Sequence, residues 1–252
     1  MDKLFDNLME RLFIESNFSL TRSEYVEEDY KCSTLLYIGQ NQQGDYFIYL
    51  QLPERLLPYV NNDIQIRLAT LIKNQANVFE KMTDGEVKIS SSFDKNATLI
   101  IFTTHEASVN ENVVKQAISI EEDPYFFKKQ VLLISDKETP TLAINFSENK
   151  DSFIAYVQRL ISDTERFNEF TSSNLFGLTD KGVEYSFIAR LYEKVPFLSL
   201  MVTPSNQEVL QQKIDDKLTA EQLRECEKLL DLDLNDLESW VTELVKEDKS
   251  ND

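Results

Sequence analysis

Apolar residues recur with two different periods along this chain, and the change between the two periods limits the folds that it can adopt. Before residue 146, short alternating or continuous apolar runs predominate, and such runs are typical of strands. These runs are residues 34–38, 46–50, 86–92, 97–103, 131–134 and 141–144. We predict that the first two runs form a hairpin with a longer loop, and that the next two pair through the turn residues Asp94-Lys95-Asn96.

A period of 3.6 residues predicts helices elsewhere. Apolar residues follow this period in the first dozen residues and in the stretches 64–82, 153–167, 183–191 and 234–245. Two capping boxes, Ser205-Asn206-Gln207-Glu208 and Thr219-Ala220-Glu221-Gln222, support helix starts in the last fifth of the chain.

The two periods together predict an α+β protein. We expect an N-terminal mixed or antiparallel sheet with helices, followed by a helical C-terminal half. Residues 1–146 are assigned to an α/β region that contains the sheet, and residues 147–252 to a mainly helical region. With 252 residues, 42% of them hydrophobic, the two regions can also form one continuous domain around a substantial core.

The charge balance makes some partners unfavourable. With 26 basic and 44 acidic residues, the chain carries a net charge of −18. Such a surface repels nucleic acid and anionic membranes, so we expect no direct nucleic-acid binding by this chain alone and no membrane association. The acidity fits either a basic partner surface or an ordinary solvated surface. No apolar run approaches the length of a membrane span, so we predict a cytoplasmic protein.

Catalytic motifs are scarce in the sequence. His105 is the single histidine, and no serine or cysteine lies in a nucleophile elbow. The two cysteines, Cys32 and Cys226, lack metal-ligand spacing. We therefore predict a protein that is not an enzyme, with no cofactor and no metal site.

One catalytic alternative remains open. Glu86 and Lys88 begin a predicted strand, and a Glu-x-Lys pair on a strand can serve a metal-dependent nuclease, with Asp45 or Asp63 as a further carboxylate. The alternative to this nuclease is an exposed strand face carrying an accidental charge pair.

The most informative segment runs from residue 120 to residue 132. Asp123 and Pro124 suit the start of a helix. Three aromatic residues follow, Tyr125-Phe126-Phe127, and successive side chains on a helix lie about 100° apart. One face cannot bury all three, so at least one should meet another surface: either a partner, as aromatics flanked by charges suggest, or a second layer of the same domain.

The stretch Glu121-Glu122-Asp123-Pro124-Tyr125-Phe126-Phe127-Lys128-Lys129 resembles the motif of the middle component of bacterial ABC-three-component systems, a group that includes Lamassu-type anti-phage defence. Three further features are similar in order and placement. They are Asp45-Tyr46-Phe47-Ile48, the stretch Lys194-Val195-Pro196-Phe197-Leu198, and an acidic helical C-terminus.

This resemblance implies a non-catalytic accessory subunit. In such systems an SMC-like ABC ATPase senses foreign DNA, an effector, often a nuclease, acts on it, and the middle component connects the two. The resemblance therefore implies ATPase and effector subunits as partners. It also implies that Asp123, Pro124, Tyr125, Phe126, Phe127, Lys128 and Lys129 form the partner-binding site.

Overall fold

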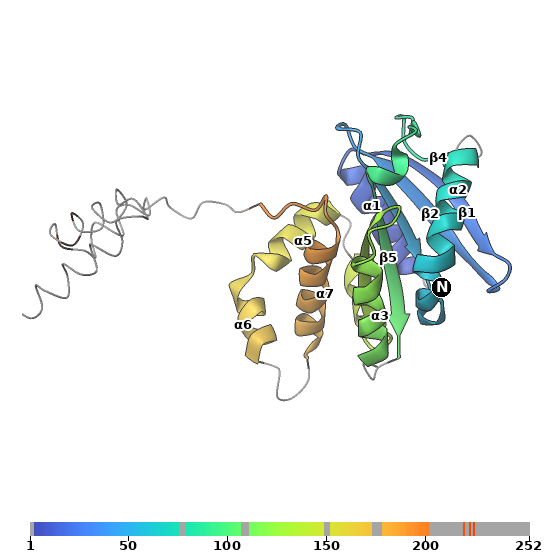
Figure 1. The fold of residues 1–252 in the computed structure, drawn as a ribbon. Coiled ribbons are helices and arrows are strands. Elements are labelled where there is room, and N and C mark those ends of the chain that lie inside the picture. The colour runs from blue at the N-terminus through green and yellow to red at the C-terminus, as the bar shows by residue number, and fades with distance from the viewer. Residues whose placement is uncertain are drawn as a thin grey trace, which may run out of the picture. The chain divides into compact units, whose positions relative to one another are not determined.

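The strand-forming runs assemble into one mixed sheet (Figure 1). The computed structural model describes residues 3–75, 79–106, 111–148, 152–172 and 178–201, together with Thr219, Gln222 and Arg224. Within these residues the sheet has six strands in the order β4-β1-β2-β3-β5-β6. They are β1 (Ser19–Glu27), β2 (Cys32–Gln40), β3 (Tyr46–Gln51), β4 (Glu80–Lys81), β5 (Ala97–His105) and β6 (Lys128–Ser135).

The sheet is antiparallel on one side and parallel on the other. Strand β2 pairs antiparallel with β1 and β3, which confirms the predicted hairpin. Its loop turns at Gly44, where φ is 91°, a value that glycine adopts without strain. Strand β5 pairs in parallel with β3 and with β6, and the last register runs from Thr98 opposite Lys128 to His105 opposite Ser135. Strand β6 is therefore an edge strand.

Helices cover both faces of the sheet. The α-helices of the described residues are α1 (Lys3–Glu15), α2 (Gln65–Gln75), α3 (Glu111–Glu121), α4 (Thr139–Glu148), α5 (Phe153–Ile161), α6 (Thr164–Ser172) and α7 (Asp180–Lys194). Helices α2 and α3 share one core with the sheet residues Ile48, Leu99 and Val131. Helices α1, α4, α5 and α7 share a second core with the opposite face, which includes Tyr49 and Ile100. Every residue of β3 is buried, because helices cover the sheet on both sides.

The predicted fold class is confirmed, and two predicted strands are wrong. Residues 86–90 have no regular secondary structure and residues 91–92 form a turn. Within this segment Lys88 uses its backbone groups to bind the side chains of Gln40 and Tyr46. Residues 141–144 belong to helix α4, in which Leu142 and Phe146 lie one turn apart in the core.

Other boundaries differ from the predicted ones. Helix α2 ends at Gln75, and the apolar stripe of residues 153–167 is divided between α5 and α6. The stretch 183–191 lies within α7, as predicted. Strand β1 escaped prediction because its sequence, SLTRSEYVE, is mostly polar. None of the described helices is long and apolar enough to cross a membrane.

Residues Met1–Met201 form one compact unit, and Val202–Asp252 form a second. In the second unit the predicted capping box at Thr219 is present. Its hydroxyl accepts a hydrogen bond from Gln222 N at 3.3 Å, and Gln222 Oε1 accepts one from Thr219 N at 2.9 Å. The predicted cap at Ser205 and the helix at 234–245 lie outside the described residues. The division of the chain after residue 146 stays a prediction.

Candidate partner-binding site

The segment Asp123–Lys129 comprises the turn that connects helix α3 to the edge strand β6 and the first two residues of that strand. Helix α3 ends at Glu121, and β6 begins at Lys128. The expectation that Asp123 and Pro124 start a helix is therefore wrong. The residue before a proline is disfavoured in the helical region, so the Asp-Pro pair follows the end of α3 instead. We call residues 123–129 the aromatic turn.

A buried lysine holds the aromatic turn together. The side chain of Lys129 is wholly buried, and its Nζ donates hydrogen bonds to the carbonyl oxygens of Asp123, Tyr125 and Phe127 at 3.0, 2.7 and 3.2 Å. The same Nζ lies 3.1 Å from Asp123 Oδ2. A buried ammonium group is tolerated only when it is paired and hydrogen-bonded, and here it gathers the backbone of the turn around itself.

Phe126 has the unusual backbone conformation of the turn. Its φ is 59°, in the left-handed region that a bulky residue rarely adopts. The carbonyl groups on either side, those of Tyr125 and Phe127, are the two that Lys129 holds. Such a conformation costs on the order of 1–3 kcal/mol and persists only where the surroundings enforce it. Lys129 supplies that constraint.

The three aromatic side chains divide between core and surface. Phe127 is buried and lies edge-on to Phe93, with ring centroids 6.0 Å apart. Tyr125 and Phe126 are 69% and 40% exposed. Lys128 is exposed as well. Of the seven residues predicted to bind a partner, four are therefore accessible, namely Pro124, Tyr125, Phe126 and Lys128. Asp123 is partly buried, and Phe127 and Lys129 are buried beneath the exposed side chains.

Asp123 connects the aromatic turn to helix α2. Its Oδ2 accepts a hydrogen bond from Gln65 Nε2 at 2.9 Å, and its Oδ1 accepts one from Tyr125 N at 3.2 Å. Burial raises the pKa of Asp123, but the hydrogen bonds from Gln65, Lys129 and Tyr125 outweigh burial, so the net pKa is lowered from 3.8. The carboxylate is thus favoured in its charged form.

A lowered pKa makes the contribution of Asp123 dependent on pH. The stabilisation is fully present above the unfolded pKa near 3.8 and is lost as the pH falls through the lower folded pKa. We expect Asp123→Asn to lower the free energy of unfolding by about 1–3 kcal/mol at pH 7, with a smaller difference at pH 3.5. Urea unfolding at both pH values measures this, with the exposed Asp136→Asn as control. An equal difference at the two pH values would contradict the assignment.

An ion pair connects the C-terminal end of helix α3, just before the aromatic turn, to helix α7. Lys194 Nζ lies 2.9 Å from both carboxylate oxygens of Glu121, and Glu121 Oε1 also accepts a hydrogen bond from Val131 N at 2.8 Å. Burial lowers the pKa of Lys194, but the hydrogen bonds and the attraction of the charges of Glu121 and Glu193 together outweigh burial, so the net pKa is raised. Sequence reasoning did not find this pair, because 73 residues separate its members and no local pattern connects them.

The residues of the nuclease alternative do not gather into a site. Glu86 and Lys88 are exposed in an unpaired segment, so the predicted strand on which that alternative depended is absent. Asp63 accepts hydrogen bonds from Tyr30 and Arg67. Among the residues that the structure describes, no group of three or more His, Cys, Asp or Glu could hold a metal ion.

The other catalytic candidate is also accounted for by the fold. His105 is buried at the end of β5, with Nδ1 2.7 Å from the carbonyl oxygen of Glu106. No serine or cysteine hydrogen bond to this imidazole is present in the described part of the chain.

Comparison with known protein families provides evidence that is independent of the structure. Residues 56–157 match the family model of the ABC-three component (ABC-3C) system Middle Component 1. The match runs from before helix α2 into α5, so it includes the whole aromatic turn. No curated protein and no solved structure matches the chain significantly. The predicted resemblance to a middle component is supported over this range.

Proposed function

We propose that this chain is a non-catalytic accessory subunit of an ABC-three-component system. In this role it links an SMC-like ABC ATPase to an effector subunit, such as a nuclease, in a Lamassu-type defence complex against phages or plasmids. The match of residues 56–157 to Middle Component 1 supports the assignment to an ABC-three-component system. In this proposal the aromatic turn is the surface on which a partner subunit docks.

The exposed aromatic pair on a constrained backbone carries the proposal. Solvent-facing aromatic side chains are common where proteins bind each other, because their rings contribute large contact areas. Lys129 holds the turn in one conformation, so a partner meets Tyr125 and Phe126 already positioned and less ordering entropy is lost on binding. Lys128 places a positive charge beside them on an otherwise acidic chain.

We expect Tyr125→Ala and Phe126→Ala to weaken binding to the ATPase or to the effector while leaving the melting temperature nearly unchanged. Truncating a central interface aromatic commonly costs about 2 kcal/mol or more, which is roughly thirtyfold in Kd. The measurement is calorimetric titration of the full chain against each purified subunit of its own system, paired with thermal unfolding of each variant.

Phe167→Ala is the matched control, because Phe167 on helix α6 is 47% exposed, close to the 40% of Phe126. It should bind as the parent does. If the turn variants bind normally, the docking surface lies elsewhere. If the parent chain binds neither subunit, the accessory role itself is refuted.

A further inference from the structure

The outer edge of strand β6 is capped by side chains at three points. Val131 N donates to Glu121, the Leu133 carbonyl accepts from Arg190, and Ser135 N donates to Glu138 at 3.2 Å. The backbone N–H and C=O of one strand residue point the same way, so these odd-numbered residues present both groups away from β5. Such capping is a common way to protect an edge strand from unwanted pairing.

Between these caps, two backbone groups of the edge are unpaired in the described residues. The carbonyl group of Val131 and the N–H of Leu133 have no hydrogen-bond partner within the described residues. In a parallel ladder, a carbonyl and an N–H spaced in this way bind the N–H and the C=O of a single residue on the neighbouring strand. That is the arrangement already present between β5 and β6.

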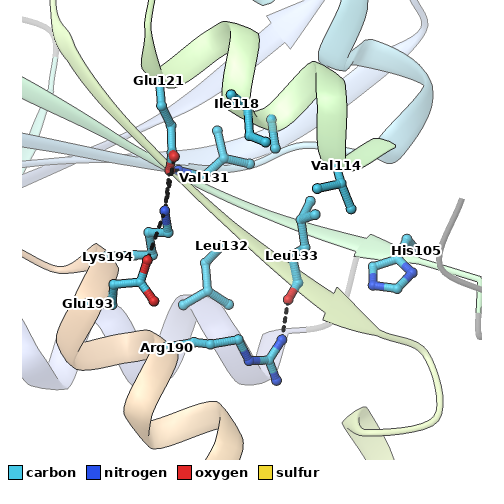
Figure 2. A pocket seen from close by; sticks show the side chains of 11 residues that line it. His105, Val114, Ile118, Glu121, Val131, Leu132, Leu133, Arg190, Glu193 and Lys194 are labelled. Carbon is cyan, nitrogen blue, oxygen red and sulfur yellow. Dashed lines mark hydrogen bonds and ion pairs between the residues drawn. The ribbon is translucent and has the colours of Figure 1, made fainter. Parts of the chain in front are cut away.

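An apolar pocket lies beside these two backbone groups, and both Val131 and Leu133 line it. It has a volume of about 320 Å³ and lies between helix α3, strand β6 and helix α7, as Figure 2 shows. Val114 and Ile118 line it from α3 and Leu133 lines it from β6, and Ile118 is 47% exposed. Its charged lining consists of Glu121 and Glu193 against Arg190 and Lys194, so these charges balance on a chain of net charge −18.

We propose that strand β6 pairs through these two backbone groups with one residue of an extended, uncharged segment of a partner subunit, which runs parallel to β6 and places one apolar side chain in this pocket. The inference rests on the proposed accessory function, but it uses a surface other than the exposed aromatics. Main-chain pairing supplies affinity and the pocket selects the side chain, as in other cases of strand addition. The balanced charge of the lining matches an uncharged segment better than a basic or an acidic one.

A second copy of this chain is a less suitable occupant. Two copies would bring together chains that each carry −18, and their mutual repulsion opposes pairing at low ionic strength. Sedimentation of the full chain alone is therefore expected to show a monomer.

Leu133→Pro tests the backbone pairing directly. Proline removes the outward N–H, and because that N–H does not face β5, no ladder hydrogen bond within the sheet is lost. The control Leu133→Ala shortens the side chain and keeps the N–H. We expect Leu133→Pro to weaken binding of the full chain to its partner subunit at least tenfold beyond the effect of Leu133→Ala. Equal binding by the two variants would overturn the strand-addition model while leaving the accessory function intact.

A second variant covers the case in which Leu133→Pro fails to fold. Ile118→Glu places a charge in the pocket and should reduce partner binding at least tenfold. Ile66→Glu is the control, because Ile66 is 44% exposed on another helix. Normal binding by Ile118→Glu would overturn the pocket assignment. A parent dimer that Leu133→Pro dissociates would identify a second copy as the occupant and overturn the partner strand. Binding of the parent to neither subunit would refute the proposed function and this inference together.

Discussion

Replacing Lys129 by Met is expected to lower the free energy of unfolding by about 3–5 kcal/mol, because breaking a buried ion pair leaves the other charge uncompensated. The variant would leave Asp123 without its ammonium partner and three carbonyl groups without their shared donor. Met is nearly as long and flexible as Lys, so it fills most of the same space. The decrease in the free energy of unfolding therefore measures the lost polar contacts more than the creation of a cavity. Urea unfolding followed by circular dichroism measures the difference.

Lys128→Met is the matched control for this experiment. Lys128 is the preceding residue and is exposed, so the same substitution should change the free energy of unfolding by less than about 0.5 kcal/mol. If Lys129→Met proves as mild as Lys128→Met, the aromatic turn does not depend on the lysine and its conformation must have another cause.

The aromatic turn shows how far sequence reasoning could go. The argument that one helical face cannot bury three successive aromatics rests on side-chain geometry, and two of the three side chains are exposed in the structure. The helical conformation assumed in that argument was wrong. Asp123 accepts a hydrogen bond from the N–H two residues later, a local turn that competes with helix capping for the same side chain.

The buried position of Lys129 could not be predicted from the sequence. Lysine is almost never fully buried, so any pattern-based analysis places it at the surface. Its burial depends on carbonyl acceptors supplied by the turn between α3 and β6. The capping of the β6 edge by Arg190 was hidden for a similar reason, since Arg190 lies 57 residues away from Leu133 in the sequence.

The outer parts of the sheet were also harder to predict than its centre. Strands β3 and β5 are buried on both faces and read as continuous apolar runs, so their positions were predicted closely. Strand β1 lies beside only the two-residue strand β4 on one side and carries polar residues such as Arg22 and Glu24. Strand β1 is held by β2, with which it pairs over nine residues. This long-range pairing leaves no periodic pattern in the local sequence of β1.

Phe127→Ala is expected to lower the free energy of unfolding by about 3–5 kcal/mol, the usual cost of truncating a fully buried phenylalanine. Its ring is 1% exposed, contacts Phe93 and belongs to the core that α2 and α3 share with the sheet. Phe126→Ala, one residue earlier and 40% exposed, should cost less than about 1 kcal/mol. Chemical unfolding of the two variants compares neighbouring residues of the same type in opposite environments.

The two variants also separate stability from binding. Phe127→Ala should weaken partner binding only to the extent that the unfolded fraction rises, because its ring does not reach the surface. Phe126→Ala should weaken binding while the fold remains stable. If both variants lose stability equally, Phe126 is part of the core in solution, and the partner contact of the aromatic turn would then depend on Tyr125 and Lys128.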